Sequence, residues 1–172
     1  MGLRLIIGGA RSGKSARAQA LAEAQAQRRG GTPVMIATAE ALDEEMRQRI
    51  ARHRAERGPA WRTLEAPLDL AAAIAGLAPE DCAVVDCLTL WLSNLMFAER
   101  SLAQETDLML EAADHALGEV IFVTNEVGMS IVPENALARR FRDEAGRMNR
   151  RVAERADEVE VMFAGVPLRL KP

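Results

Sequence analysis

Several residue types that mark particular classes of protein are scarce in this sequence of 172 residues. Tyrosine is absent and aromatic residues make up only 3% of the chain, so we expect no stacking surface for single-stranded nucleic acid. With 25 acidic against 22 basic side chains the formal net charge is −3, which removes the positive field of a general nucleic-acid binder. The sequence therefore predicts no nucleic-acid partner.

Long apolar runs and cysteines are equally scarce. No stretch approaches the roughly 18 consecutive apolar residues of a membrane span, and we expect neither a span nor a signal peptide. Cys82 and Cys87 bracket a predicted buried strand. Two thiols make no disulfide framework, so we expect packed core residues and a cytoplasmic protein. With 49% hydrophobic residues the chain can bury a core, and its length predicts one domain over residues 1–172.

Short apolar runs alternate with longer amphipathic stretches along the chain. This alternation predicts an α/β fold, with a mostly parallel sheet, helices on both faces and ligands beyond the carboxyl ends of the strands. The last two runs flank Ala164-Gly165, which predicts a hairpin and an antiparallel edge strand. The predicted strands are 3–7, 34–37, 83–86, 120–124, 159–163 and 166–170, and the predicted helices are 13–29, 42–57, 68–77, 88–99, 106–117 and 135–155.

A glycine-rich motif joins the first predicted strand to the first predicted helix. In a loop of this kind the backbone N–H groups and the helix N-terminus bind phosphates, the lysine bridges the β- and γ-phosphates, and the hydroxyl ligates Mg²⁺. Lys14 is one of only two lysines in the chain, beside Lys171. We therefore predict a nucleotide site with Lys14 as a catalytic residue, and not a chance turn. The motif G-x-x-x-x-G-K-[ST] is satisfied in full by Gly8, Gly9, Ala10, Arg11, Ser12, Gly13, Lys14 and Ser15.

Asp86 is the candidate for the second metal ligand. A magnesium site of this type needs a carboxylate at the end of a neighbouring buried strand, and Asp86 ends the apolar run 83–86. We predict that Ser15 and Asp86 bind Mg²⁺. The alternative is that Asp86 caps the helix that follows, a favoured position for aspartate in any protein.

His53 lies within an arginine-rich predicted helix, where it shares a face with Met46 and Ile50. Its neighbours at four residues before and after, Arg49 and Arg57, are permanently charged and disfavour the imidazolium. A neutral imidazole close to a polyphosphate can attack phosphorus or hydrogen-bond a phosphate oxygen. The competing interpretation is a packed histidine. The other histidine, His115, has the sequence setting of an ordinary surface residue.

Several segments, spread over nearly the whole chain, carry a resemblance to one known family. They are the phosphate-loop motif, Ile36-Ala37-Thr38-Ala39, Leu42-Asp43-Glu44-Glu45-Met46 followed by Arg49-Ile50 and His53, Trp61-Arg62-Thr63 with Glu65, Val123-Thr124-Asn125-Glu126-Val127-Gly128-Met129, Ile131-Val132-Pro133-Glu134-Asn135, Phe141-Arg142-Asp143, Ala145-Gly146-Arg147 and Asn149. In these segments the chain resembles the bifunctional adenosylcobinamide kinase/adenosylcobinamide-phosphate guanylyltransferase family of cobalamin biosynthesis. The run from Val123 onward is the most specific part.

The resemblance implies a P-loop NTPase (RecA-like) fold and two successive reactions. The first phosphorylates adenosylcobinamide with ATP or GTP, and the second transfers GMP from GTP to that phosphate through a guanylyl-histidine. The matching histidine is His53. A homotrimer is also implied. The residues that match the family's nucleotide contacts are the phosphate loop, Thr38, Ala39, Glu40, Arg54, Ala55, Glu56, Arg57, Glu65 and Asp86.

The chain departs from the family pattern at two positions. Members of the family can carry two adjacent histidines where this chain has Arg52-His53, which leaves His53 as the sole candidate for the covalent intermediate. A glutamate can occur where this chain has Asp86, so the shorter carboxylate binds either Mg²⁺ or a nucleotide hydroxyl.

Two further regions allow more than one interpretation. The apolar loop 125–133 suits contact with the large apolar corrinoid or with a neighbouring subunit. Arginines crowd 139–155, but Phe141, Ala145, Met148 and Val152 recur at helical spacing, which predicts an amphipathic helix with a solvated basic face and not a nucleic-acid site.

Two rival functions remain open from the residues. One is a simple P-loop kinase that forms no covalent intermediate. The other is a nucleotide-gated interaction module, against which the acidic net charge and the scarce aromatics count.

Overall fold

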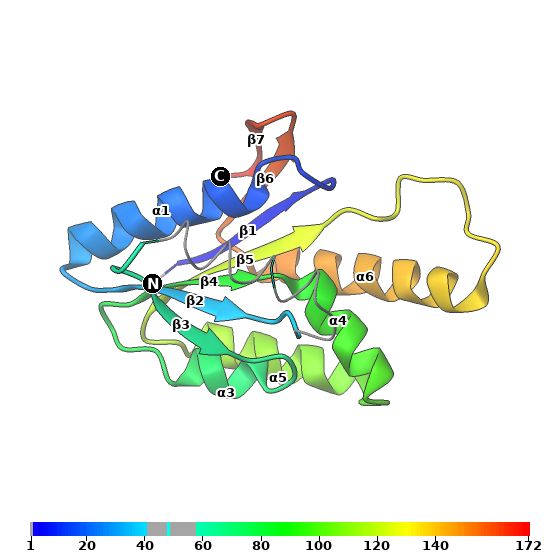
Figure 1. The fold of residues 1–172 in the computed structure, drawn as a ribbon, viewed down its shortest axis with the longest axis horizontal. Coiled ribbons are helices and arrows are strands. Elements are labelled where there is room, and N and C mark those ends of the chain that lie inside the picture. Colours follow the sequence, from blue (N-terminus) through cyan, green and yellow to red (C-terminus); the bar gives the residue numbers. More distant parts are fainter. Residues whose placement is uncertain (1, 41–47, 49–57) are drawn as a thin grey trace.

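The computed structural model describes residues 2–40, 48 and 58–172, so that of the predicted helix 42–57 only Gln48 is described. The described strands form a seven-stranded sheet in the order β3-β2-β4-β5-β1-β6-β7 (Figure 1). Their bounds are β1 Leu3–Gly8, β2 Pro33–Ala37, β3 Arg62–Glu65, β4 Cys82–Asp86, β5 Glu119–Asn125, β6 Glu158–Phe163 and β7 Val166–Lys171.

The predicted sheet is confirmed in its mostly parallel pairing and its antiparallel end. β1 pairs in parallel with β5 and β6, β4 with β2 and β5, and β2 with β3. β6 and β7 pair antiparallel around a turn at Ala164 and Gly165, both of which have positive φ. β3 was not predicted, because Arg-Thr-Leu-Glu has no apolar run. It is a half-exposed edge strand whose one partner among the described strands is β2.

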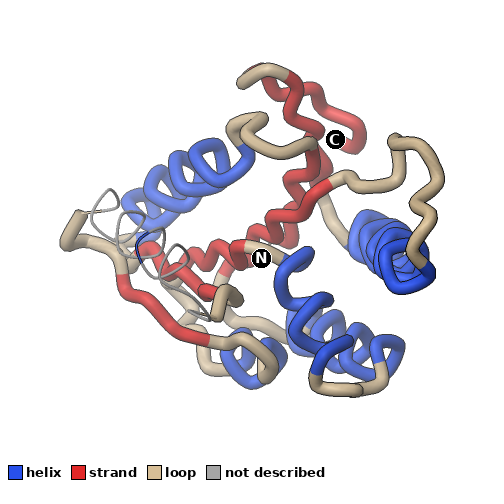
Figure 2. The backbone as a smooth tube through the Cα atoms, turned by 45° about the vertical axis from the view of Figure 1, so that its right-hand side comes forward, coloured by secondary structure: helices blue, strands red, loops and turns tan. Residues whose placement is uncertain are grey.

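Helices cover both faces of the sheet, as predicted. Among the described helices α1 (Lys14–Arg29) lies on one face, and the others lie on the opposite face (Figures 1 and 2). Side chains alternate along β4, where Val84 packs toward α1 while Ala83 and Val85 pack in the larger cluster on the other side. The other described helices are α3 (Leu70–Ala75), α4 (Leu88–Phe97), α5 (Leu102–Asp114) and α6 (Ala136–Arg155).

One helix boundary differs clearly from the prediction. α5 begins at Leu102, four residues before the predicted start, because Ser101 caps it by accepting a hydrogen bond from the backbone N–H of Gln104. It ends before His115, whose exposed ring contacts the Glu111 carbonyl. α6 follows the amphipathic prediction, because Ala145, Met148 and Val152 are buried.

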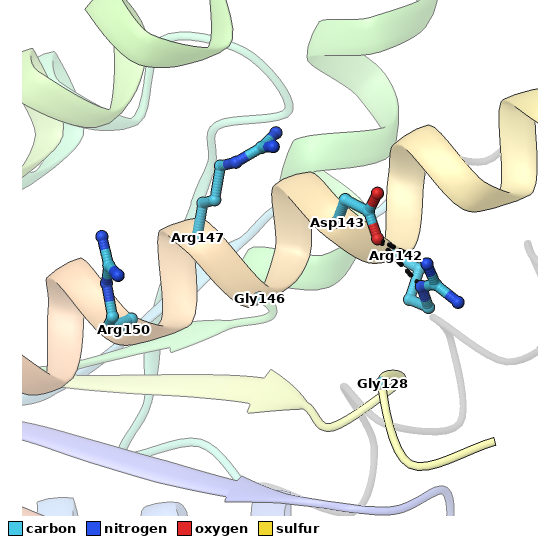
Figure 3. Close-up of a pocket in the computed structure, with 6 residues that line it drawn as sticks. All are labelled: Gly128, Arg142, Asp143, Gly146, Arg147 and Arg150. Atoms are coloured by element: carbon cyan, nitrogen blue, oxygen red, sulfur yellow. Dashed lines mark hydrogen bonds and ion pairs between the residues drawn. The ribbon is translucent and has the colours of Figure 1, made fainter. Parts of the chain in front are cut away.

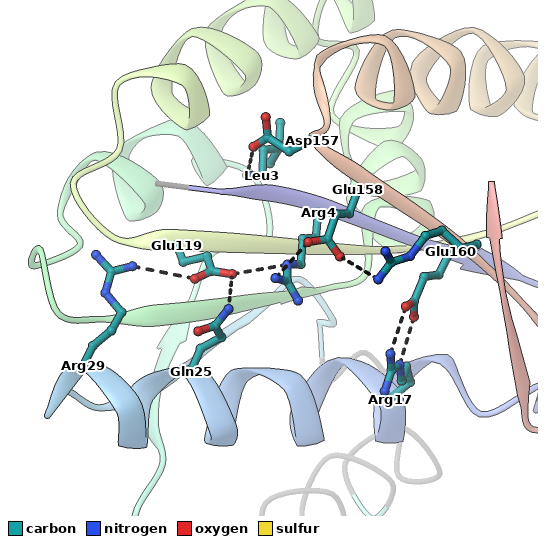
Figure 4. A network of polar contacts seen from close by, with 10 residues as sticks. Leu3, Arg4, Arg17, Gln25, Arg29, Glu119, Asp157, Glu158 and Glu160 are labelled. Carbon is teal, nitrogen blue, oxygen red and sulfur yellow. Dashed lines mark hydrogen bonds and ion pairs between the residues drawn. The ribbon is translucent and has the colours of Figure 1, made fainter. Parts of the chain in front are cut away.

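Small residues and ion pairs hold α1 against the sheet. Ala18, Ala22 and Ala26 are buried at successive turns, which lets the helix approach the strands closely. On the helix flank Arg17 makes a bidentate ion pair with Glu160, Gln25 donates to Glu119, and Glu119 also contacts Arg4 and Arg29 (Figure 4). The position of α1, and of the loop before it, is therefore fixed from several strands.

The described helices include none that is both long and apolar enough to cross a membrane. The two cysteines are free and buried, as the sequence predicted.

Candidate active site

The phosphate loop forms a tight turn between β1 and α1 that depends on two of its glycines. A Cβ at Gly8 would lie 2.7 Å from the Met162 carbonyl oxygen of β6 and 2.9 Å from Ser12 Oγ. Gly13 has φ of 94° immediately before the helix, a conformation that other residues rarely adopt. The glycines therefore allow close backbone contact and point the first N–H groups of α1 into the loop.

Lys14 lies inside the loop that it serves. Its side chain is 7% exposed, and Nζ donates to the Gly9 carbonyl at 2.5 Å and lies 3.5 Å from Ser12 Oγ. Burial lowers the pKa of Lys14, while the nearby Cys87 and Asp86 act in the opposite direction. A phosphate oxygen in the loop would give this poorly hydrated ammonium a charged partner in place of a carbonyl.

The β6–β7 hairpin closes one side of the phosphate loop. The Gly165 N–H donates to the Ser12 carbonyl at 3.1 Å, and a Cβ at Gly13 would meet Gly165 Cα at 3.4 Å. Arg17, one turn into α1, donates to Glu160 of β6 at 2.9 and 2.8 Å. This pair was not predicted, although Glu160 is an isolated charge between the apolar residues of a predicted strand.

Asp86 ends β4 on the sheet edge that carries the phosphate loop. The expectation that its strand neighbours β1 was wrong, because β5 lies between them, but Asp86 is still close enough to Lys14 to influence its pKa. The helix-cap alternative is not supported, because the N-cap of α4 is Cys87 and no side chain caps it.

The residues predicted to bind Mg²⁺ have chemistry that fits the ion. Within the described ranges neither the Asp86 carboxylate nor the Ser15 hydroxyl has a hydrogen-bond or ion-pair partner. Those ranges also contain no cluster of three or more His, Cys, Asp or Glu side chains that could hold a metal. Magnesium in nucleotide sites takes one or two protein oxygens and completes its shell with phosphates and water, so one free carboxylate and one free hydroxyl beside the loop suffice.

The remaining described candidates lie at the ends of β2 and β3. Thr38 is fully buried, and its hydroxyl accepts from the Cys87 N–H and donates to the Cys87 carbonyl, both at 2.8 Å. Its side chain therefore joins the ends of β2 and β4. Ala39 and Glu40 follow it and are more exposed, and Glu65 ends β3 opposite Ala37.

The two cysteines, Cys82 at the start of β4 and Cys87 just after its end, are unsuited to nucleophilic catalysis. Burial raises the pKa of Cys82 to about 12, and burial, reinforced by Asp86, raises the pKa of Cys87. Both are therefore thiols at neutral pH, and the thiolate is the nucleophilic form.

A buried polar network, also missed from the sequence, joins β5 to two helices. Thr124 Oγ1 donates to Asn149 Oδ1 of α6 at 2.8 Å, and Asn149 Nδ2 donates to the Asn125 carbonyl at 3.2 Å. The Asn125 N–H donates to Thr89 Oγ1 of α4 at 2.8 Å. Because Asn125 is also in register with Gly8, the network fixes α6 relative to the phosphate loop. Isolated Thr and Asn residues in the sequence gave no signal of this pairing.

Five predicted site residues lie outside the described residues, so their predicted roles stay predictions. They are His53, Arg54, Ala55, Glu56 and Arg57.

Sequence comparison identifies close relatives over nearly the whole chain. Residues 4–170 match the model of the family described as cobinamide kinase / cobinamide phosphate guanyltransferase. A bifunctional adenosylcobalamin biosynthesis protein from Pseudomonas aeruginosa is 47% identical over 97% of this chain and 96% of its own length. Proteins of the same description from Salmonella typhimurium and Escherichia coli are 42% and 38% identical, each over 97% of this chain and 98% of their own length.

Among solved structures, the flagellar accessory protein FlaH from Methanocaldococcus jannaschii is similar with a TM-score of 0.54. The match covers 99% of this chain and 78% of FlaH at 14% identity, a level that bears on the fold alone. With the family match it confirms the predicted α/β P-loop NTPase fold of the RecA-like kind.

Proposed function

Because the chain belongs to the cobinamide kinase / cobinamide phosphate guanyltransferase family, we propose that it is a transferase with both activities in cobalamin biosynthesis. It phosphorylates adenosylcobinamide with ATP or GTP and then transfers GMP from GTP to adenosylcobinamide phosphate. The observation that carries this proposal is the family match over residues 4–170, which includes a complete phosphate loop with a buried lysine.

The first reaction is a phosphoryl transfer at the phosphate loop. The acceptor hydroxyl oxygen forms a bond to the γ-phosphorus, the bond from that phosphorus to the β,γ-bridging oxygen breaks, and the hydroxyl proton is released. The protein's part is to position the phosphates and neutralise their charge. The loop N–H groups and Lys14 do so, held in place by α1 and the β6–β7 hairpin.

The second reaction needs a nucleophile, and we assign that role to His53. A neutral imidazole nitrogen attacks the α-phosphorus of GTP and displaces pyrophosphate, which leaves GMP on the histidine. A phosphate oxygen of the acceptor then attacks the same phosphorus, the P–N bond breaks, and its electron pair returns to the imidazole. Two displacements thus replace one, and neither requires a deprotonated serine or cysteine.

Ser15 and Asp86 are the residues we assign to Mg²⁺, which in such sites neutralises the phosphates and polarises their oxygens. The assigned nucleotide contacts are the phosphate loop, Thr38, Ala39, Glu40, Arg54, Ala55, Glu56, Arg57, Glu65 and Asp86.

A homotrimer in the cytoplasm completes the proposal. In the described sheet β7 is an edge strand paired only with β6, and Val166, Leu168 and Leu170 along it are exposed. Met129 and Ile131 on the loop after β5 are 82% and 93% exposed. Unpaired edge backbone and exposed apolar side chains favour contact with another subunit, and the loop equally suits the apolar corrinoid. Light scattering on the purified protein tests the trimer, and a monomer would contradict it.

Labelled GTP tests the covalent step. The protein is incubated with Mg²⁺ and GTP that carries label at either the α- or the γ-phosphate, then denatured and treated with acid or base. We expect α-label on the protein, stable to base and labile to acid, as a histidine phosphoramidate requires. The label should be lost in His53→Ala and retained in His115→Ala, which removes the exposed histidine at the end of α5.

Absence of α-label from the wild-type protein, with γ-phosphate still transferred to adenosylcobinamide, would contradict the guanylyl-histidine intermediate and favour the simple kinase. Label that survives in His53→Ala would move the nucleophile elsewhere.

A further inference from the structure

A groove on α6 lies outside the set of residues assigned to the nucleotide. It has a volume of about 370 Å³ and is lined by Gly128, Arg142, Asp143, Gly146, Arg147 and Arg150 (Figure 3). We call it the α6 groove. Three arginines and one aspartate line it, so the lining carries a net positive charge in a chain of negative net charge.

The arginines of α6 divide into two groups by their partners. Arg151 and Arg155 pair with Asp107 and Asp114 of α5, and Arg139 donates to the carbonyls of Pro133 and Glu134. These three attach α6 to its neighbours. The groove arginines have different partners. Arg142 pairs with Asp143, Arg147 with Glu144 and Arg150 with Glu154, all of them residues of α6 itself.

Pairs within one helix leave the arginines available to a ligand. Such pairs at a solvated helix surface are weak, and the Arg150–Glu154 pair is long, at 3.6 Å. A phosphate monoester carries about −1.5 to −2 charges at pH 7 and accepts charge-assisted hydrogen bonds from guanidinium groups. Exchanging a carboxylate of the same helix for a phosphate therefore breaks no contact between elements.

Gly146 opens the floor of the groove. A Cβ built at this position meets no atom within 4 Å, although the residue lies inside a 20-residue helix. Gly146 follows Arg142 by one helical turn and precedes Arg150 by another, so a gap separates the two guanidinium-bearing side chains. Glycine in a helix interior is unfavourable relative to alanine, and here the surrounding packing does not require it.

The groove begins at the sheet edge that carries the phosphate loop. Asn125 ends β5 in register with Gly8, the next residue donates its N–H to the Gly8 carbonyl at 3.1 Å, and Gly128 of the groove follows closely. Asn149 holds α6 to the same strand end. The Gly128 end of the groove is thus joined through the end of β5 to the strand end that leads into the phosphate loop.

We propose that the α6 groove binds the phosphate of the phosphorylated acceptor during guanylyl transfer. The assignment rests on the proposed function. In this step an oxygen of that phosphate forms the new bond to the α-phosphorus while the P–N bond to the protein breaks, and the groove arginines hold the other phosphate oxygens. They contribute nothing to the preceding attack on GTP.

The two steps can be measured separately on the same protein. The enzyme is guanylylated with α-labelled GTP, freed of nucleotide, and mixed with increasing concentrations of adenosylcobinamide phosphate. In the variant with Arg147→Gln and Arg150→Gln together we expect the acceptor concentration for half-maximal transfer to rise by about tenfold or more. Guanylylation of the protein by GTP should be unchanged.

Two further variants separate binding from general effects of α6. Gly146→Leu fills the groove without removing a charge and should raise the same acceptor concentration, with a melting temperature close to that of the wild type. Arg140→Gln removes an exposed arginine of the same helix that does not line the groove, and it should leave both steps unchanged.

Normal transfer in both groove variants would overturn the proposal. So would slower guanylylation by GTP in those variants, which would assign the groove to the triphosphate. If the wild-type protein takes no label at all, the proposed function fails first, and the acceptor assignment fails with it.

Discussion

The phosphate loop and the α6 groove are both cationic sites at one edge of the sheet, but their charges are held in opposite ways. Around the loop, Arg17 reaches from α1 to Glu160 of β6, and the Lys14 ammonium is buried within the loop. In the groove, the ion-pair partners of Arg142, Arg147 and Arg150 among the described residues are all acids of their own helix. The charges around the phosphate loop are therefore held by contacts between different elements. Those of the α6 groove are held within one helix and stay accessible on its surface.

The comparison teaches which charges belong to the fold and which are free for ligands. An ion pair between different elements cannot be exchanged for a ligand contact without loosening the structure, so its role is to stabilise the fold. An ion pair within one helix can be exchanged at little cost. Variants in the two regions should therefore differ in what they disturb.

The largest effect is expected for Lys14→Ala. Removal of the charge that we assign to phosphate binding should lower both γ-phosphoryl transfer and guanylylation of the protein by on the order of 10²–10³-fold. Labelled GTP measures both rates. Lys171→Ala is the matched control, because Lys171 contacts the last carbonyls of α6 and not the loop. If Lys14→Ala kept either rate, the buried lysine would have only a structural role in that reaction.

A smaller effect, on stability, is expected for Glu160→Gln. The hydrogen bonds from Arg17 hold the pKa of Glu160 below its ordinary value. The pair thus stabilises the fold above the ordinary glutamate pKa of about 4.3, and this contribution is lost as the pH falls through the lowered value. We expect Glu160→Gln to cost about 1–2 kcal/mol at pH 7, since Arg17 is only partly buried and water screens the pair.

Urea unfolding at several pH values tests this expectation. The difference in the free energy of unfolding between wild type and Glu160→Gln should shrink as the pH falls below about 4. Glu154→Gln, which removes the partner of Arg150 within α6, should change the free energy of unfolding by less than about 0.5 kcal/mol. An equal decrease in the free energy of unfolding for the two variants would contradict the difference between the two regions.

The smallest effect is expected for Gly146→Ala. A methyl group in the open floor of the groove meets no atom, and the helix gains from the loss of glycine. The free energy of unfolding should rise by about 0.5–1 kcal/mol. Gly8→Ala in the phosphate loop should instead destabilise the protein, because its methyl group would lie 2.7 Å from the Met162 carbonyl. A loss of stability in Gly146→Ala would mean that the groove is not open.

Much of the fold could be predicted from the sequence, because the patterns that mark strands and the phosphate loop are local. Apolar runs located every parallel strand except β3, and the motif at Gly8–Ser15 located the loop. β3 escaped because a half-exposed edge strand has no apolar run. The start of α5 was not predicted correctly, because the only signal for it is the single capping residue Ser101.

The site was less predictable because its parts meet only through the fold. The order of the strands places β5 between Asp86 and β1 and brings Glu160 to Arg17. This order cannot be predicted from local periodicity. The same holds for α6. The helical spacing of Met148 and Val152 predicted the buried face, but only the structure separates the arginines that pair with α5 from those that line the groove.

The central claim is that the phosphate loop binds the nucleotide and the α6 groove binds the acceptor. A single rapid-quench time course tests it most directly. Protein, α-labelled GTP and adenosylcobinamide phosphate are mixed, and labelled protein and labelled product are followed together for the wild type, Lys14→Ala and the Arg147→Gln, Arg150→Gln double variant. We expect crossed defects, with Lys14→Ala failing to form labelled protein and the double variant accumulating labelled protein that it discharges slowly. Slowing of the same step by both variants would contradict the separation of the two regions.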